Sequence, residues 1–500
     1  MSEKATSARA ATGISGLDDV LGGGFPTGHI YLVQGDPGVG KTTLGLQFLL
    51  AGAAQGQNAL YITLSETADE LRAVAASHGL DVSGVEIYEV IPSAELMAGD
   101  DNSLFHPSEV ELGETVRGIL REVERIGPSR IVIDSLSELR LLSQTALRYR
   151  RQILAFKQLL GERSSTVLLL DDRSENPGDM HVESIAHGIV ELDQLSPLYG
   201  AERRRLRVKK LRGVGFRGGY HDMRIRTGGL DVFPRLVAAE HPHEPFGGAI
   251  ESGSPGLDAL TGGGLDRGTT TLILGPAGTG KSAIASVYAA AIAERGEKAA
   301  LFIFEEALAT LTQRTEALGI PLRRHIADGR ISVKQVDPAE LAPGEFAYCI
   351  RAAVEQEGAR LVVIDSLSGY YQAMPEETFL TLHLHELFSY LRQKGVAVIL
   401  TLVQHGFAGK MDTPIDLSFL ADTVLLLRFF ETRGELRKAI SVPKKRSGAH
   451  ESAIREFALG EGGLRVGEPL RNFQGILTGT PTFHGSAEGL LAEGVSSGRR

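Results

Sequence analysis

Short apolar runs alternate with longer segments of helical periodicity along most of the chain. In the first half the apolar runs lie at residues 30–34, 59–64, 130–134 and 166–170, and in the second half at 271–274, 299–304, 360–365 and 396–402. Amphipathic segments at 44–50, 68–78 and 148–160, and again at 283–291, 309–318 and 379–393, separate them. Strands that alternate with helices predict a doubly wound, mostly parallel sheet in each half, so the predicted fold class is α/β.

Each half then ends with a strand and a predicted β-hairpin. Strand 188–192 leads into 202–212, and strand 422–427 leads into 436–446. These segments alternate apolar and charged residues, as expected for strands with one buried face.

The two halves are copies of one another. Motifs recur at a constant offset of 240 residues, so that the segment at 16–18 (Gly-Leu-Asp) matches 256–258 and the glycine triplet at 22–24 matches 262–264. Such a long period indicates duplication of a whole domain. We predict a flexible tail at 1–11, a first domain at 12–240, a linker at 241–249, a second domain at 250–480 and a flexible tail at 481–500. The linker region is rich in Pro, Gly and His, and the C-terminal tail in Gly and Ser.

Each predicted domain carries one G-x-x-x-x-G-K-[ST] motif between its first strand and the next helix. This order matches the P-loop of nucleotidases, whose backbone N–H groups and lysine bind phosphates at a helix N-terminus. A chance glycine-rich turn would not recur with matching flanks. The predicted nucleotide-binding residues are Gly35, Asp36, Pro37, Gly38, Val39, Gly40, Lys41, Thr42 and Thr43 in the first domain, and Gly275, Pro276, Ala277, Gly278, Thr279, Gly280, Lys281, Ser282 and Ala283 in the second.

A Mg²⁺ site is predicted beside each P-loop. The P-loop hydroxyls of Thr42 and Ser282 are the usual direct ligands, and an aspartate at the end of a buried strand is the usual second contact. Asp134 and Asp365 stand at those strand ends in both halves.

Composition narrows the class of protein. The 500 residues contain one cysteine, Cys349, which excludes an intrachain disulfide and is typical of a reducing cytoplasm. The net charge of −10 argues against nucleic-acid binding by the surface as a whole. No apolar run reaches the length of a membrane span, so we expect no membrane association.

These motifs resemble the KaiC family, double-ring RecA-type ATPases and autokinases known from circadian clocks. The resemblance rests on the tandem P-loops, Ile-Asp-Ser-Leu-Ser after each buried strand, Lys-x-Arg in each closing hairpin, and the segments at 453–457, 471–473 and 479–481. It covers roughly residues 12–482 and implies two tandem RecA-like P-loop domains. It further implies ATP and Mg²⁺ as ligands, an ATP-dependent homo-hexamer with ATP between subunits, and a KaiB-like or other signalling protein as partner.

The resemblance also assigns catalytic carboxylates. Glu305, with Glu306 beside it, is similar to the family's general base, and Lys281 and Lys41 to its catalytic P-loop lysines. A carboxylate there can orient the nucleophile in line with the γ-phosphate. In the first domain the matching pair is Ser65 and Glu66, so Glu66 is the remaining candidate for the catalytic carboxylate. A shift of one residue at a strand end points its side chain to the other face, and we therefore expect slower hydrolysis there, or binding without much turnover. The alternative is that Glu305 only caps the following helix.

Two Lys-x-Arg segments resemble the family's fingers, which reach a neighbouring subunit's γ-phosphate. They comprise Lys210, Leu211 and Arg212 in the first domain and Lys444 and Arg446 in the second. A cation supplied by a neighbour makes hydrolysis depend on assembly. The alternative is a solvated basic strand edge that discourages aggregation.

Serine autophosphorylation is a further activity that the resemblance implies. The family's adjacent Ser-Thr acceptors align with Ser418 and Phe419, so one acceptor is lost, and Thr413 offers another hydroxyl nearby. Ser418 is therefore the candidate phosphoacceptor, with an ordinary surface serine as the alternative.

Two other functions compete with a signalling ATPase. A DNA-dependent, RecA- or helicase-like motor would use the basic run at 203–212, although the acidic chain and the lack of a separate DNA-binding module argue against it. A nucleotide-gated scaffold would bind ATP without turnover, which Ser65 favours for the first domain and Glu305 disfavours for the second.

Overall fold

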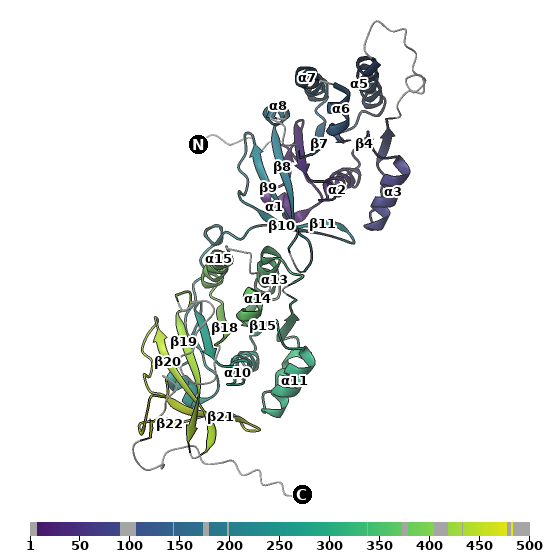
Figure 1. Cartoon of the computed structure of the whole chain (residues 1–500). Coiled ribbons are helices and arrows are strands. Elements are labelled where there is room, and N and C mark those ends of the chain that lie inside the picture. Colours follow the sequence, from purple (N-terminus) through teal and green to yellow (C-terminus); the bar gives the residue numbers. More distant parts are fainter. Residues whose placement is uncertain are drawn as a thin grey trace. The chain divides into compact units, whose positions relative to one another are not determined.

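The computed structural model divides the chain into two compact units, Met1–Arg235 and Leu236–Arg500 (Figure 1). It describes residues 8–90, 107–143, 145–173, 180–197, 200–337, 339–372, 379–404, 419–432, 434–477 and 482–483. Each unit contains a large sheet with helices on both faces. No helix in these ranges is both long and apolar enough to cross a membrane.

The elements of the first unit follow the predicted alternation of strands and helices. Its strands are β1 (Arg9–Ala10), β2 (Phe25–Pro26), β3 (Ile30–Gly35), β4 (Ala59–Thr63), β5 (Glu86–Glu89), β6 (Arg130–Asp134), β7 (Thr166–Asp172), β8 (Gly188–Leu195), β9 (Arg203–Leu211), β10 (His221–Arg226) and β11 (Gly229–Phe233). Its helices are α1 (Ser15–Leu21), α2 (Lys41–Ala53), α3 (Ala68–Ser77), α5 (Pro107–Ile126), α6 (Leu136–Ser143), α7 (Ala146–Glu162) and α8 (Met180–Ile185).

The sheet of the first unit has the order β11-β10-β9-β8-β3-β7-β6-β4-β5. Strands β8 to β5 in this order are parallel, whereas β9, β10 and β11 are antiparallel additions at one edge. The strand β3, which leads into the P-loop, therefore lies centrally, between β8 and β7. This position is typical of ligand sites in doubly wound sheets.

Alternation along the central strands builds two cores, because successive side chains point to opposite faces. Tyr61 and Leu168 pack on the face covered by α1, α2 and α3. Ile62 and Leu169 pack on the other face, with α5, α6 and α7. The two sets of helices lie on opposite sides of the sheet in Figure 1.

The second unit repeats this plan. Its strands are β12 (Ala249–Ile250), β13 (Leu265–Asp266), β14 (Thr270–Gly275), β15 (Lys298–Ile303), β16 (Ile331–Gln335), β17 (Ala359–Asp365), β18 (Ala397–Val403), β19 (Thr423–Thr432), β20 (Glu435–Lys445), β21 (Arg455–Gly460), β22 (Gly463–Pro469), β23 (Phe473–Gln474) and β24 (Thr482–Phe483). Its helices are α9 (Pro255–Leu260), α10 (Lys281–Glu294), α11 (Leu308–Ala317), α12 (Leu322–Ala327), α13 (Pro343–Glu355), α14 (Leu367–Gln372), α15 (Leu380–Gln393) and the 3₁₀ turn η2 (Ala238–Glu240).

Its sheet has the order β16-β15-β17-β18-β14-β19-β20-β21-β22, again parallel except for the last three strands. Phe302 and Leu400 face α13, α14 and α15, whereas Leu301 and Ile399 face α10 and α11. Two doubly wound units in tandem confirm the predicted fold class. Both hairpins are also longer than predicted, because each is extended by a second antiparallel pair of strands.

The structure differs from the predicted N-terminal tail and from the predicted end of the first domain. Arg9–Ala10 form β1, paired with β2, and Ala10 is buried, so the expected N-terminal tail is ordered from this strand onward. Leu236 and Ala238 fall in the predicted first domain, but they are buried in the core of the second unit, which begins at Leu236. Within the predicted linker, Glu244 accepts a hydrogen bond from Lys394 over 2.8 Å. Part of the predicted linker is therefore packed on the second unit.

Candidate functional site

The P-loop of each unit runs from the central strand into a helix N-terminus. Gly40 and Gly280, the residues before α2 and α10, have φ of 112° and 108°. A Cβ at Gly40 would lie 2.8 Å from Ile225 Cδ1, and one at Gly280 would lie 2.5 Å from Leu459 Cδ1. Only glycine combines this backbone conformation with such close packing by the antiparallel strands. Each P-loop thus ends at the N-terminus of a helix, a position that favours phosphate binding.

Both P-loop lysines fold back on their own loops. Lys41 Nζ donates to the carbonyls of Gly35 and Asp36 over 2.8 and 3.0 Å. Lys281 Nζ donates to those of Gly275 and Pro276 over 3.0 and 2.8 Å. Their side chains are only 8% and 7% exposed. An ammonium group held inside a glycine loop fits a polyphosphate ligand, because burial makes a nearby anion favourable.

In the second unit, burial lowers the pKa of Lys281 to about 8, against the opposing effect of the Asp365 and Glu305 charges. Among the described residues no carboxylate forms an ion pair with Lys281. A buried cation in this state has capacity for an anionic ligand.

The predicted Mg²⁺ ligands lie together in the first unit. Thr42 Oγ1 donates to Asp134 Oδ2 over 3.0 Å. The buried Tyr61 hydroxyl donates to the same oxygen over 2.5 Å. Burial raises the pKa of Asp134, while these two hydrogen bonds oppose that rise. A hydroxyl beside a carboxylate is an oxygen pair suited to a hard cation.

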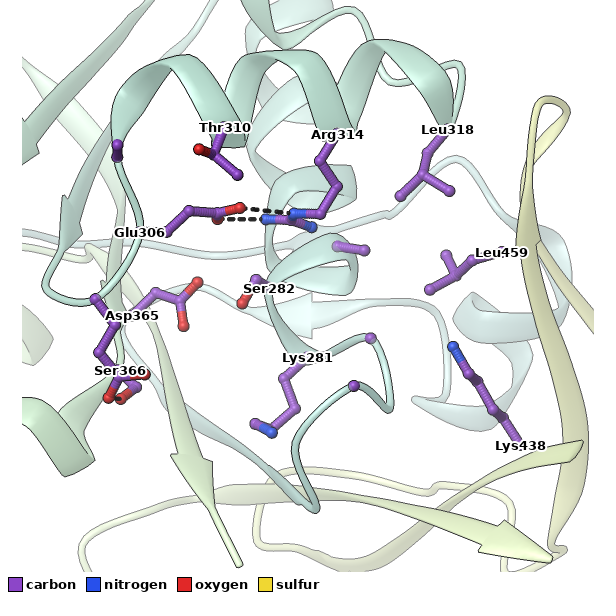
Figure 2. A pocket seen from close by; sticks show the side chains of 15 residues that line it. Lys281, Ser282, Glu306, Thr310, Arg314, Leu318, Asp365, Ser366, Lys438 and Leu459 are labelled. Carbon is purple, nitrogen blue, oxygen red and sulfur yellow. Dashed lines mark hydrogen bonds and ion pairs between the residues drawn. The ribbon is translucent and has the colours of Figure 1, made fainter. Parts of the chain in front are cut away.

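In the second unit Ser282 and Asp365 line one cavity of about 790 Å³. Lys281 and Glu305 line it as well, and so do Leu318, Lys438 and Leu459. Figure 2 shows Asp365 and Ser366 at one end, with Leu318 and Leu459 at the other. Asp365 also accepts a hydrogen bond from Thr401. The cavity thus has a polar end for phosphate and metal and an apolar end, in the size range of small-molecule sites.

The two adjacent glutamates of the second unit have different surroundings. Glu305 is exposed and accepts a hydrogen bond from Ser366 Oγ over 2.7 Å. Glu306 instead forms a two-bond ion pair with Arg314, over 3.0 and 2.7 Å, as Figure 2 shows. Both carboxylate oxygens of Glu306 are occupied by the guanidinium, whereas only one oxygen of Glu305 accepts the Ser366 hydrogen bond. Glu305 is therefore the better placed of the two to accept a proton.

The corresponding strand end of the first unit has no equivalent pair. Ser65 replaces the first carboxylate, and valine occupies position 74, which corresponds to Arg314. Glu66 is exposed, and its pKa is raised by partial burial and by the charges of Asp134 and Glu70. Its backbone is fixed by Thr63, whose hydroxyl donates to the Glu66 carbonyl over 2.7 Å. Glu66 therefore feels the charge of Asp134 at the predicted Mg²⁺ site, but it stands one residue after Ser65, the position that corresponds to Glu305.

The candidate fingers contact their own unit. Lys210 Nζ donates to the carbonyl of Glu183 over 2.7 Å, and Arg212 Nη2 to that of Ser184 over 2.9 Å. Arg446 Nη2 donates to the carbonyl of Phe419 over 3.1 Å. Leu211, grouped with the fingers on sequence, is buried in the core and is therefore a packing residue. Lys444 lies in β20, opposite Val424.

Several residues at the sites escaped the sequence analysis. Tyr61, Asp172, Arg314 and Thr401 belong to ordinary strand or helix positions and carry no motif. They lie near the P-loops because of the order of the strands in the sheet. The only sequence signal that could have found them was a comparison of equivalent positions in the two halves. Ser418 and Thr413 lie outside the described residues.

Comparison with known proteins agrees with this geometry. The family model described as "ATPase: KaiC" matches residues 10–237 and again 250–471. "Circadian clock protein KaiC3" of Synechocystis sp. (strain PCC 6803) is 28% identical over 486 residues, which is 95% of each chain. "Circadian clock oscillator protein KaiC" of Synechococcus elongatus is 27% identical over 492 residues, covering 96% of this chain and 93% of that protein. The homologue of the same name from Thermostichus vulcanus is 28% identical over 486 residues. With two tandem P-loop units and a family match to each, this chain belongs to the KaiC ATPase family.

Proposed function

We propose that the chain binds Mg·ATP at both P-loops and hydrolyses it mainly at the second. The observation that carries the proposal is the cavity of the second unit. It places the Glu305 carboxylate, the buried Lys281 and the Asp365 carboxylate around one space. The first unit has equivalent binding residues but Ser65 in place of the base.

Each residue has a distinct role in this proposal. Lys281 and the loop N–H groups hold the β- and γ-phosphates, and Ser282 with Asp365 would hold the metal. Bound Mg²⁺ would neutralise phosphate charge. Glu305, positioned by Ser366, accepts a proton from the attacking water or hydroxyl. The ion pair with Arg314 of α11 holds the Glu306 carboxylate away from this role.

We propose further that the chain acts as an ATP-dependent homo-hexamer. Lys210, Arg212, Lys444 and Arg446 would then approach a neighbour's nucleotide, for which Lys210, Arg212 and Arg446 would leave their present contacts with backbone carbonyls. Lys210 and Arg212 are held by hydrogen bonds to backbone carbonyls, whereas Arg446 also forms an ion pair with Asp422 over 3.6 Å, which it would have to give up. Assembly and hydrolysis would depend on one another for that reason.

Two finer activities complete the proposal. Serine autophosphorylation at Ser418 follows from the family, and so does signalling through a KaiB-like or other protein partner in a clock-type system. The presence of Lys281, Glu305 and Asp365 at the second site supports phosphoryl transfer there. Because Phe419 replaces one hydroxyl residue of the family's Ser-Thr pair, Ser418 is the one acceptor left in that pair.

The DNA-motor alternative loses its main support. In the basic run of β9, Arg205 pairs with Asp193 over 2.9 Å, Arg207 with Glu191 over 2.5 Å and Lys209 with Glu183 over 3.0 Å. Side chains neutralised within the fold add little to phosphate binding. The run is better explained as an internal ion-pair ladder.

The experiment compares ATP turnover by the full chain with that of Lys281→Ala and Lys41→Ala. We expect Lys281→Ala to abolish most turnover and Lys41→Ala to retain most of it. Equal loss in both variants would contradict the assignment of hydrolysis to the second site. Native mass spectrometry with and without ATP, followed by phosphosite mapping of the same sample, tests the hexamer and Ser418.

A further inference from the structure

A carboxylate of the first unit contacts the P-loop lysine directly. Asp172 Oδ1 lies 2.9 Å from Lys41 Nζ. Asp172 is the last residue of β7 and stands opposite Gly35 in the parallel pair of β3 and β7. The strand order therefore brings this carboxylate to the mouth of the P-loop.

The second unit has no such group at the same place. In the pair of β14 and β18, the residue opposite Gly275 is Val403. The difference is a substitution within an otherwise repeated architecture. It provides a natural comparison between a P-loop with a carboxylate neighbour and one without.

The contact uses the remaining hydrogen-bonding capacity of Lys41. An ammonium group has three N–H donors. In the first unit three oxygens lie within hydrogen-bonding distance, those of Gly35, Asp36 and Asp172, at 2.8, 3.0 and 2.9 Å. In the second unit the two loop carbonyls accept from Lys281, and no carboxylate among the described residues takes the third position.

Asp172 is also held from its other side. Ser137 Oγ, at the start of α6, donates to Asp172 Oδ2 over 3.1 Å and lies 3.2 Å from Asp171 Oδ1. Asp171 is itself paired with Arg140 of the same helix. Helix α6 thus positions the carboxylate that faces Lys41.

We propose that Asp172 competes with the β- and γ-phosphates of ATP for Lys41, and that this competition weakens ATP binding at the first site. This inference rests on the proposed nucleotide binding at both P-loops. An incoming polyphosphate must replace the Asp172 contact, and the displaced carboxylate then repels it. A ligand without those phosphates does not meet this competition. Asp172 is accordingly a residue that sets the affinity of one site rather than a catalytic residue.

The test measures binding of a fluorescent ATP analogue with Mg²⁺ to the full chain carrying Lys281→Ala, which leaves the first site as the main binding site. In this background Asp172→Val, the residue type of the second unit, and Asp172→Asn, which keeps the shape, are compared with the parent. We expect either change to tighten binding about 10-fold, since a hydrogen bond to a charged group is lost from the free state. The fluorescent AMP analogue should show a much smaller change.

Two matched variants complete the design. Val403→Asp, in a chain with Lys41→Ala, should weaken binding of the ATP analogue at the second site by a similar factor. Asp81→Asn removes an exposed carboxylate of the first unit and should leave binding unchanged, so that a general charge effect is separated from competition.

The outcomes separate this inference from the proposed function. Unchanged or weaker binding by both Asp172 variants, with intact circular dichroism, would overturn competition and leave ATP binding at the first site standing. If no variant, including Asp172→Asn, binds the ATP analogue, nucleotide binding at the first site is wrong and the inference with it.

Discussion

The Tyr61 hydroxyl donates a hydrogen bond to Asp134 Oδ2 over 2.5 Å inside the first unit. Tyr61 is fully buried on β4, and its neighbour β6 ends at Asp134. Burial and the Asp134 charge raise the pKa of Tyr61 well above its ordinary value, so the phenol remains a neutral donor. The second unit holds its aspartate differently, through Thr401, because leucine occupies the position of Tyr61.

Tyr61→Phe should destabilise the first unit. The change removes a buried hydrogen bond to a carboxylate, which contributes about 1.5–3 kcal/mol to the free energy of unfolding. Urea denaturation of the full chain measures the effect as a lower midpoint of the corresponding transition. Tyr220→Phe is the control, since Tyr220 is 38% exposed. Equal midpoints for Tyr61→Phe and the parent would show that this hydrogen bond contributes nothing.

Glu305→Gln and Glu306→Gln should affect ATP hydrolysis differently. Glu305→Gln removes the proposed base and should lower kcat about 100-fold or more, since general base catalysis contributes about 10²–10⁴-fold. Glu306→Gln breaks the ion pair with Arg314 and should change kcat much less. Steady-state ATPase assays distinguish the two. A larger loss in Glu306→Gln than in Glu305→Gln would reverse the assignment.

Ser65→Glu should raise hydrolysis at the first site. The change restores a carboxylate at the position that corresponds to Glu305, beside the Thr42 and Asp134 pair. The assay uses chains carrying Lys281→Ala, so that residual turnover reports on the first site. Ser65→Gln has a similar size without the charge and serves as the control. Identical rates for the two variants would mean that the missing carboxylate does not limit this site.

ATP affinity at the second site should fall as pH rises above about 8. Burial lowers the pKa of Lys281 from 10.5 to about 8, so the side chain loses its charge above that pH. Bound phosphates favour the charged lysine, and binding must then take up a proton, which lowers affinity by up to about tenfold per pH unit. The terminal phosphate is already ionised there, because its pKa is about 6.

Titration with the fluorescent ATP analogue between pH 7 and 10 measures this dependence in chains carrying Lys41→Ala. Adding Lys281→Ala should remove the dependence along with most of the affinity. A flat profile in the chain that retains Lys281 would contradict the proton uptake.

Local sequence patterns were sufficient to predict the central strands and helices and the two phosphate-binding loops. The apolar runs and P-loop motifs predicted β3, α2, β14 and α10 to within a few residues, because strand burial and loop conformation depend on neighbours along the chain. The two edge strands added to each sheet were not predicted. Residues such as His221 and Asp222 in β10 show weak alternation, and their pairing with β9 forms only in the folded unit.

The sequence by itself determined that two copies of one α/β domain each carry a P-loop, an aspartate at a strand end and a closing hairpin, since these features are short-range patterns that recur in the same order in both halves. Tertiary structure decided which groups surround each lysine. Asp172 and Arg314 reach the two sites through strand order and helix packing, across separations for which the chain carries no local signal. The difference between the sites is therefore a property of the folded sheets, where distant residues meet at the ends of adjacent strands.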